Sequence, residues 1–398
     1  MTDTCDILIS GGGIAGLAAA ALFGNHGYRV ILVDPAPPVT DGDAEGADLR
    51  TTALLQPART LLDRAGVWDS IAPYGAALEI MQIVDAGDSA GARRAARAFK
   101  SSDVSDLPFG WNVPNWRLRQ VLTDRLAAFD SVDFRPGLRA TQLFTRMNEA
   151  RVTLSDGTRV KARLVIAADG RHSVMRAAAG IGVTTRRYGQ KALAFAVTHP
   201  EPHDNVSTEI HQTGGPFTFV PLPDHDGQPC SAVVWMDDGA KSLARLNASV
   251  SDFEAQASER SSGLLGPLRL VTRRSLWPII SQKAARFSAQ RLALVAEAAH
   301  VVPPIGAQGL NMSLTDIRAL FELVEKSPDS VGDAAMLDAY HRARFADVSL
   351  RVAGIDMLNR TSQAASPALR TARAWGVNAL HEIAPVRKTL MQLGLGTT

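Results

Sequence analysis

The segment Gly11–Gly16, with the sequence Gly-Gly-Gly-Ile-Ala-Gly, constrains the fold of this chain more than any other feature. The apolar run Asp6–Ser10 predicts a buried strand before it, and the small residues of Leu17–Asn25 predict a helix after it. Tyr28–Val33 is then expected to form a second strand, which ends at Asp34. A strand, a glycine turn, a helix and a second strand are typical of the start of a Rossmann-like α/β domain.

Each glycine of this turn has its own physical task in a dinucleotide site. Gly11 permits the tight turn, Gly13 lets the backbone approach a pyrophosphate, and Gly16 lets the helix touch the strand. Asp34 can accept hydrogen bonds from ribose hydroxyls and repels a 2′-phosphate. A tight turn that binds nothing is the alternative. The predicted contacts to the dinucleotide are Gly11, Gly13, Ile14, Ala15, Gly16 and Asp34.

Two later strands are also expected to end beside acidic residues. Asp169 and Gly170 follow the apolar strand Leu164–Ala168, and Glu297 follows the apolar strand Leu292–Val295. Ligands of open α/β sheets bind at the carboxyl ends of the parallel strands, so both acids are candidate ligand contacts. A plain helix cap is the alternative role for Asp169.

A proline-bent loop, Pro303–Ala307, follows the second of these strands, and a helix is expected to begin near Gln308. The first turn of a helix has unpaired N–H groups and the positive end of the helix dipole. Such a helix start would stabilise negative charge on a bound ligand.

The pattern changes between Gly180 and Pro278, where strand-like runs alternate with turns rich in Pro, Gly and Asp. We therefore expect an α/β protein with a Rossmann-like domain, a second, mainly antiparallel β-sheet domain for the substrate, and a helical C-terminal tail. The expected division is 1–75, 101–180 and 281–335 for the dinucleotide domain, 76–100 and 181–280 for the substrate domain, and 336–398 for the tail.

Composition excludes several classes of protein. The formal net charge is +2, which does not suit a nucleic-acid binder. Cys5 and Cys230 are the only cysteines, too few for a disulfide framework or a metal site, so neither is expected. The sequence has no run of apolar residues long enough to span a membrane, and Met1–Asp6 does not resemble a signal peptide. We therefore expect a cytoplasmic protein.

Three motifs have now been described: the glycine turn Gly11–Gly16, the strand end at Asp169-Gly170, and the segment from Glu297 to Asn311. In this order they resemble the ubiquinone-biosynthesis hydroxylases, a family of FAD monooxygenases whose fold is like that of para-hydroxybenzoate hydroxylase. Asp48–Leu54 and Trp111–Asn115 are also similar to connecting segments of that family, and the resemblance extends from Asp6 to about Arg344. It implies FAD as the cofactor and NADPH or NADH as a transient electron donor. It also implies that O2 adds at the flavin C4a atom and that the resulting hydroperoxide hydroxylates a phenol ring.

The resemblance also implies roles for individual residues. The glycine turn and Asp34 would hold the ADP half of FAD, and Arg50 and Arg119 would contact the flavin or its phosphates. Asp169 and Gly170 would lie beside the pyrophosphate and the approach of the nicotinamide. Glu297 would bind the ribityl chain. The segment that would cover the isoalloxazine is Gly306, Ala307, Gln308, Gly309, Leu310 and Asn311.

This chain departs from the family pattern at two places in the third motif. The family more usually has Gly-Asp where Ala296-Glu297 stand, and Ala-Gly where Gly306-Ala307 stand. The longer acid can still reach a ribityl hydroxyl, so FAD binding is still expected. No catalytic side chain is assigned, and the best candidates belong to the loop at the flavin face, Pro304, Gly306, Gln308 and Gly309.

Candidates for the substrate pocket are His211, Gln212, Phe219 and Trp235, in the strands of the second domain. Alternation along a strand does not tell which face each side chain takes, so a place in the core or on the surface is an equal alternative.

The C-terminal segment is basic. From His341 to Thr398 there are eight Lys and Arg against three Asp and Glu, a net charge of +5. Such a tail could contact an anionic membrane or a partner of a biosynthetic complex, or it could be a helical lid packed on the core. The favoured function is hydroxylation of a lipophilic, polyprenylated phenol in ubiquinone synthesis, in the cytoplasm or at the inner membrane. The alternatives are a hydroxylase of a small soluble aromatic, a reductase of prenyl chains, and a non-catalytic FAD-binding scaffold subunit.

Overall fold

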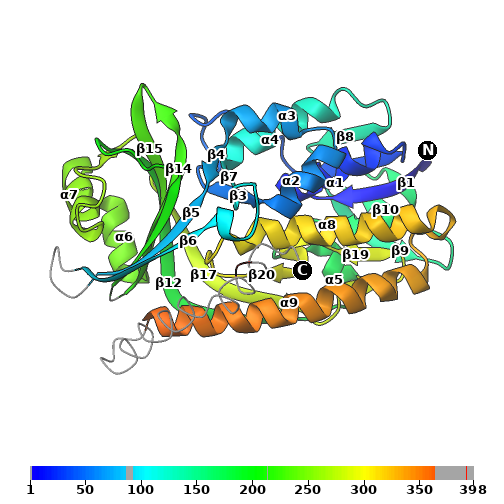
Figure 1. The fold of residues 1–398 in the computed structure, drawn as a ribbon. Helices are drawn as coiled ribbons and strands as arrows, with labels where there is room; N and C mark the ends of the chain where they lie inside the picture. Colours follow the sequence, from blue (N-terminus) through cyan, green and yellow to red (C-terminus); the bar gives the residue numbers. More distant parts are fainter. Residues whose placement is uncertain (1, 87–92, 213, 364–390, 392–398) are drawn as a thin grey trace.

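A computed structural model describes residues 2–86, 93–212, 214–363 and 391 of the chain. A largely parallel sheet forms its first part (Figure 1), because β1, β2, β8, β11 and β19 all run in the same direction. The strands are, in order across the sheet, β18 (Ser288–Ala289), β19 (Leu292–Leu294), β11 (Arg159–Ala167), β1 (Thr2–Ser10), β2 (Val30–Asp34) and β8 (Val132–Pro136).

The strand β11 is longer than the sequence pattern indicated. The residues from Arg159 onward continue directly into the predicted apolar strand and form one element with it. The first half of this element pairs with an antiparallel meander. That meander consists of β9 (Ala140–Thr145) and β10 (Ala150–Leu154). The second half of β11 lies in the centre of the parallel sheet, where burial on both faces requires apolar residues throughout.

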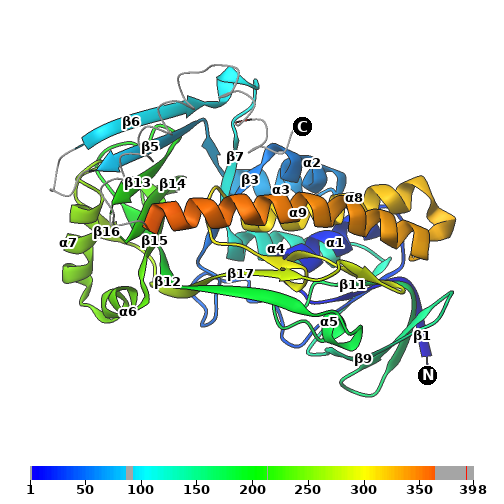
Figure 2. The same cartoon turned by 90° about the horizontal axis from the view of Figure 1, so that it is seen from below.

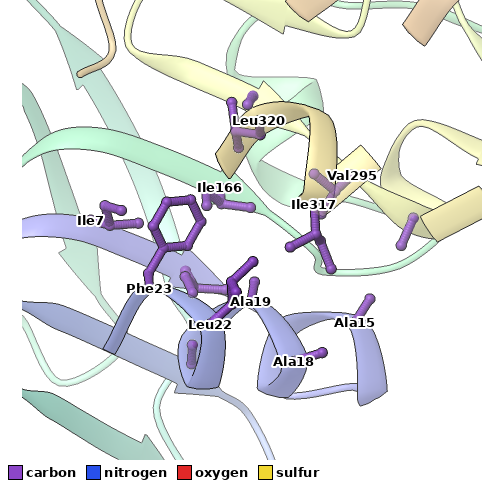
Figure 3. Close-up of a cluster of buried hydrophobic side chains, with 14 of the residues drawn as sticks. Ile7, Ala15, Ala18, Ala19, Leu22, Phe23, Ile166, Val295, Ile317 and Leu320 are labelled. Atoms are coloured by element: carbon purple, nitrogen blue, oxygen red, sulfur yellow. The ribbon is translucent and has the colours of Figure 1, made fainter. Parts of the chain in front are cut away.

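Helix α1 (Ile14–Asn25) packs between this sheet and α8 (Gln308–Lys326). Figure 3 shows side chains of α1, among them Phe23, directed toward Ile7 and Ile166 of the sheet and toward Ile317 of α8. Most buried residues of α1 are alanines, so helix and sheet can approach closely.

The second sheet is mainly antiparallel, as predicted, with β13 and β5 as its parallel pair. Helices α6 (Gly239–Asn247) and α7 (Val250–Arg260) cover its outer face, and the opposite face turns toward the parallel sheet (Figures 1 and 2). Its strands are, in order, β20 (His300–Val301), β17 (Ser275–Ala284), β12 (Val183–Thr198), β15 (Gln228–Asp238), β14 (Gly215–His225), β13 (Val206–Gln212), β5 (Ile80–Ala86) and β6 (Arg93–Lys100), with β16 (Arg269–Leu270) beside β12.

A small third sheet joins the two parts. It contains β3 (Thr51–Leu55), β7 (Gly110–Pro114) and β4 (Ala76–Leu78), and Nδ2 of Asn112 donates to the carbonyl of Pro221 in β14 at 2.9 Å. The helices near it are α2 (Gln56–Arg64), α3 (Trp68–Ile71) and α4 (Asn115–Leu126), while the short α5 (Val174–Ala178) follows β11.

Helix α9 (Ala334–Gln363) runs along the molecule beside α8 (Figure 1). The hydroxyl of Tyr340 donates to the carbonyl of Leu294, and the hydroxyl of Tyr188 in β12 donates to Asp356 at 2.6 Å. The described part of the tail is therefore packed on both sheets. Residues 364–390 and 392–398, which hold four of the eight basic residues counted above, lie outside the described part. No described helix is both long and apolar enough to cross a lipid bilayer.

Candidate active site

The carboxyl ends of four strands meet at one edge of the parallel sheet. Ser10 of β1 pairs with Ala167 of β11 and with Val33 of β2, and Ala167 pairs with Leu294 of β19. The glycine turn and the segments that carry Asp34, Asp169 and Glu297 all follow these ends directly. The three motifs, far apart in the chain, therefore lie at the same edge, as the sequence predicted.

The glycine turn has the geometry that its sequence requires. Gly11 has φ of +111°, and a Cβ there would lie 2.3 Å from the carbonyl oxygen of Ala168. A Cβ on Gly16 would lie 1.8 Å from the carbonyl oxygen of Gly11, so the turn closes tightly on itself. A Cβ on Gly13 would meet nothing within 4 Å, although Gly13 is the N-terminal cap of α1. Open space at an uncapped helix start is suited to an anionic group.

Asp34 fastens the turn to the end of β2. Its carboxylate accepts hydrogen bonds from the backbone amide of Gly12 at 2.6 Å and from that of Ala36 at 2.9 Å. These bonds hold the acid beside the turn, where a ribose of the dinucleotide is expected. Its contact with ribose hydroxyls stays a prediction.

Arg50 is held by a buried carboxylate. Nε and Nη2 of Arg50 donate to the two oxygens of Asp48 at 2.8 and 2.7 Å, and Nδ2 of Asn115 donates to the same carboxylate at 3.0 Å. Burial would raise the pKa of Asp48, but the hydrogen bonds and charge of Arg50 outweigh it, and the pKa is lowered. The Arg50 guanidinium is thus fixed in place as a charged group.

The other side of Arg50 faces the second sheet. Its guanidinium lies 4.1 Å from the centroid of the Trp277 ring in β17, in a cation–π contact. The hydrogen bond and charge of Asp48, with a smaller contribution from the charge of Glu297, raise the pKa of Arg50. Arg50 therefore connects the Asp48 segment to the second sheet.

Asp169 lies within a short polar segment that is joined to the Glu297 loop. Burial raises the pKa of Asp169, and its Oδ2 accepts from the backbone amide of Met175 at 3.1 Å. Nη1 of Arg176, on α5, donates to the carbonyl of Ala298 at 2.8 Å. The N-terminal cap of α5 is Ser173, whose hydroxyl accepts from the amide of Arg176, so Asp169 is not the cap residue and only supports the first turn through Met175. The other oxygen of Asp169, Oδ1, is buried without a hydrogen-bond partner among the described residues.

The loop before α8 is shaped by residues with positive φ. Gly306 has φ of +62° and Ala307 has φ of +55°, and α8 begins at Gln308 without a side-chain cap. Asn311 ties this helix start to β3, because its amide donates to the carbonyl of Ala53 and accepts from the amide of Leu55. Pro304, Gly306 and Gly309 are exposed, and Gln308 and Leu310 are half-buried.

The substrate candidates divide between the two faces of the second sheet. Phe219 and Trp235 are buried in the core beneath α6 and α7, which is the structural alternative considered for them. His211 follows Ile210, which belongs to that same core, so His211 lies on the opposite face, toward the parallel sheet. Gln212 is half-buried at the end of β13. The structure therefore does not bring the four candidates together.

The face of the second sheet below the α8 loop is apolar. Ala192, Met236 and Ile279 form a buried cluster against which Ile305 of the loop packs. Val220 of β14 packs near Ala307 and Ala53 in an adjoining cluster. A flat aromatic ring between the loop and this face would be shielded from water.

Orphaned polar atoms test whether this site fits FAD. Nε of Arg119, Oδ1 of Asp169 and Nε1 of Trp277 are buried without a hydrogen-bond partner among the described residues. Buried polar atoms are rarely unpaired, so these three are expected to have a partner that is not part of the chain. Together with the open space at Gly13 and the uncapped α8, they fit a long, polar, anionic dinucleotide. Among the described residues, no group of three His, Cys, Asp or Glu is placed to hold a metal ion.

The sequence interpretation missed Asp48, Trp277 and Glu209. Asp48 lies two residues before Arg50, a spacing that permits the bidentate pair seen here. Glu209 and His211 lie two residues apart on a strand, a spacing that places both side chains on one face. No signal in the sequence brings Trp277 to Arg50, because Arg50 lies in the segment before β3 and Trp277 lies in β17 of another sheet.

Comparison with known proteins agrees with this geometry. The FAD binding domain family matches residues 4–352. The ubiquinone hydroxylase UbiL of Rhodospirillum rubrum is 31% identical over 98% of this chain and 90% of its own length. The 3-demethoxyubiquinol 3-hydroxylase of Escherichia coli is 27% identical over 98% of both chains.

Solved structures show the same fold. The p-nitrophenol 4-monooxygenase PnpA of Pseudomonas putida superposes with a TM-score of 0.79 at 17% identity, covering 99% of this chain and 98% of its own. PqsL of Pseudomonas aeruginosa, in complex with 2-aminobenzoylacetate, superposes with a TM-score of 0.75 at 21% identity, covering 91% of this chain and 97% of its own. The chain therefore belongs to the FAD-binding hydroxylase family that includes the ubiquinone hydroxylases, and it is an FAD-dependent monooxygenase.

Proposed function

We propose that this enzyme uses NAD(P)H and O2 to hydroxylate the ring of a polyprenylated phenol in ubiquinone biosynthesis. The observation that carries the proposal is the apolar face of the second sheet, Ala192, Met236 and Ile279, opposite the loop that precedes α8. A lipophilic ring suits this face better than a charged aromatic acid does. The names of the curated relatives support the same substrate class.

The residues that would hold FAD follow from the site. Gly11–Gly16 and Asp34 would bind the ADP half, and Arg119 would contact the flavin or its phosphates. Asp169 and Gly170 would lie beside the pyrophosphate, and Glu297 would bind the ribityl chain. The segment 306–311 would cover the isoalloxazine, with Arg50 at its edge. We also propose that 1–75, 101–180 and 281–335 hold the cofactor, while 76–100 and 181–280 hold the substrate. When bound, FAD supplies the redox chemistry, taking electrons from NAD(P)H and delivering one oxygen atom of O2 to the ring.

The chain itself would contribute positioning and charge. The helix start at Gln308 would direct N–H groups and the positive dipole end toward the flavin, which would favour its anionic reduced form. The Asp48 carboxylate would keep Arg50 fixed against Trp277. The apolar cluster below Ile305 would exclude water from the reacting ring.

Access of a prenylated substrate is a separate part of the proposal. Residues Ala334–Gln363 form a helix packed on both sheets, which is the arrangement expected of a lid. Contact with a membrane or a partner protein would then depend on residues after Gln363. Removal of 364–398 should abolish binding to anionic liposomes if that contact exists.

Metabolite analysis of a deletion strain tests the substrate class. We expect the strain to accumulate a prenylated quinone precursor that lacks one ring hydroxyl, and the plasmid-borne gene to remove it. Accumulation of a small soluble aromatic would favour the alternative substrate. Purified holoprotein that binds FAD but oxidises NAD(P)H with no phenol would favour the scaffold alternative.

A further inference from the structure

Glu209 and His211 form a polar pair on β13. Nε2 of His211 lies 2.7 Å from Oε1 of Glu209, and their side chains are 14% and 26% exposed. Burial would raise the pKa of Glu209, but the hydrogen bond from His211 is the largest effect that opposes burial, and the pKa is lowered. Glu209 is therefore a carboxylate, and its Oε1 accepts a hydrogen bond from Nε2 of His211.

The other ring nitrogen of His211 has no partner. Nδ1 is buried and lacks a hydrogen bond within the described part of the chain. With the proton on Nε2, neutral imidazole has its lone pair on Nδ1, which makes this atom a hydrogen-bond acceptor. A buried acceptor without a donor among the described residues is suited to accept a hydrogen bond from a bound ligand.

The pair lies on the same face as the apolar cluster. Across the sheet, Glu209 pairs with Thr218, Thr218 with Val234, and Val234 with Ala194. Val234 packs in the cluster that Ile305 covers. Two strand spacings separate β13 from β15, a distance of about 10 Å. Glu209 and His211 therefore lie on the face that carries the apolar cluster, two strands from Val234.

Other charged groups on this face come from the neighbouring strands. Asp85 of β5 is in register with His211, and Ile83 is in register with Glu209 and with Arg97 of β6. The strands on the other side, β14 and β15, present Thr218 and Val234. Within these registers, His211 is the only imidazole.

We propose that His211 is the proton acceptor that converts the bound phenol into its phenolate, with Glu209 as its positioning residue. The inference rests on the proposed function and adds the group that activates the substrate. The phenol O–H bond breaks, the proton bonds to Nδ1, and the electron pair stays on the phenolate oxygen. The imidazolium is then paired with Glu209. When the product regains its hydroxyl, the proton returns to the ring oxygen.

The chemistry of the site requires such an acceptor. Transfer of a phenol from water to an apolar face disfavours its charged form and raises its pKa. The phenolate ring is more electron-rich than the phenol ring and accepts an electrophilic oxygen more readily. A histidine paired with a carboxylate offsets the desolvation of the phenolate and acts as a general base.

The test compares phenol ionisation in holoenzyme variants. The probes are 4-propylphenol and its 2,3,5-trifluorinated analogue, whose fluorines make it a stronger acid and which keeps one ring C–H beside the hydroxyl for hydroxylation. Ultraviolet difference spectra report whether the bound probe is a phenol or a phenolate, without turnover. The variants are His211→Gln and Glu209→Gln, and the matched control is His225→Gln, because His225 also lies near a carboxylate but is half exposed at the β14–β15 turn.

We expect wild type and His225→Gln to bind 4-propylphenol at pH 7 as the phenolate, and His211→Gln to bind it as the neutral phenol. Hydroxylation of 4-propylphenol by His211→Gln should fall about 100-fold, while the fluorinated analogue keeps its rate. Glu209→Gln should show the same pattern with a smaller loss, and it serves as the test if His211→Gln does not retain FAD.

Two results would overturn the proposal. One is a phenolate spectrum of bound 4-propylphenol in both His211→Gln and Glu209→Gln. The other is an equal loss of hydroxylation rate for both probes in His211→Gln. Failure of the wild type to bind 4-propylphenol would also overturn it. If the wild type binds the phenolate and His211→Gln does not, but no phenol is hydroxylated, the inference stands and the proposed function fails.

Discussion

The carboxylate of Asp316, in α8, accepts a hydrogen bond at 3.1 Å from the backbone amide of Ala296, the residue before Glu297. Nε2 of His300 and Nε of Arg344 contact the same carboxylate at 2.6 and 2.8 Å, and Asp316 is fully buried. Through this buried network, α8 and α9 hold the loop that carries Glu297, the proposed contact to the ribityl chain. The position of one proposed cofactor contact thus depends on residues outside the proposed site.

Asp316→Asn should destabilise the protein strongly. The change removes the buried carboxylate that contacts His300 and Arg344 and leaves Arg344 paired only with the partly buried Asp347, which costs about 3 kcal/mol of unfolding free energy. Urea denaturation at pH 7 measures the change, with Asp338→Asn on the exposed face of α9 as the control. A loss of less than about 1 kcal/mol, the value for a surface pair, would contradict the network.

The cost of Asp316→Asn should depend on pH. Burial opposes ionisation of Asp316, but the charges and hydrogen bonds of His300 and Arg344 outweigh it, so the pKa falls below its ordinary value of 3.8. A lowered pKa stabilises the fold above the unfolded value and ceases to do so as pH falls through the folded value. The stability difference between wild type and variant should stay constant from pH 7 to 5 and shrink below about pH 4. A difference that grows on acidification would have the wrong sign.

Replacement of either of two alanines with positive φ, in the Glu297 loop and in the loop before α8, by glycine should increase the stability of the protein. Ala296 has φ of +54° and Ala307 has φ of +55°, a region that costs an L-residue about 1–2 kcal/mol. Glycine removes this cost but loses about 0.5–1 kcal/mol of chain entropy, so each Ala→Gly variant should gain up to about 1 kcal/mol. Ala299, with φ of −95°, is the control, and Ala299→Gly should be less stable. Thermal melting of the three variants measures these changes in stability. A lower melting temperature for both Ala296→Gly and Ala307→Gly would contradict the prediction.

Two glycines of the turn allow the effect of a substitution on stability to be distinguished from its effect on FAD binding. Gly13→Ala meets no atom of the chain and keeps an allowed φ of −69°, so apoprotein stability should change by less than about 0.5 kcal/mol. FAD binding should weaken by about tenfold or more, equivalent to 1.4 kcal/mol. Gly16→Ala places Cβ against the carbonyl of Gly11 and should lose about 3 kcal/mol or more of stability. Unchanged FAD affinity in a stable Gly13→Ala protein would show that the cofactor lies elsewhere.

Arg50→Lys should weaken FAD binding despite the retained charge. Lysine loses the bidentate pair with Asp48 and the planar contact with Trp277, which is equivalent to about tenfold in Kd. Arg59→Lys is the matched control, because Arg59 also lies over a tryptophan, Trp111, and near an acid, Asp63. Fluorescence titration of the apoproteins with FAD compares them. An equal effect of both changes would remove Arg50 from the site.

Much of the parallel sheet could be predicted from local sequence. The glycine turn and the apolar strands before Asp34, Asp169 and Glu297 are short-range patterns, and parallel pairing places their ends at one edge. The start of α8 at Gln308 was likewise predicted by the proline-bent loop. Local signals do not show that Asp316 reaches Ala296, because that contact depends on how α8 crosses the strand end.

The second sheet shows the limit of strand patterns. Period-two alternation separates Phe219 and Trp235 from His211 only after one face has been assigned to the core. That assignment depends on α6 and α7, which follow β15 and cover one face of the sheet. The pairing of Arg50 with Trp277 similarly requires the two sheets to be placed against each other.

The most direct measurement of the central claim is the fate of labelled oxygen. Purified holoenzyme is mixed with NADPH, a prenylated phenol and 18O2, and the product is analysed by mass spectrometry. The account predicts a ring-hydroxylated product with one 18O atom, formed in step with NADPH oxidation. NADPH oxidation without a labelled product, or a product whose new oxygen comes from water, would contradict it.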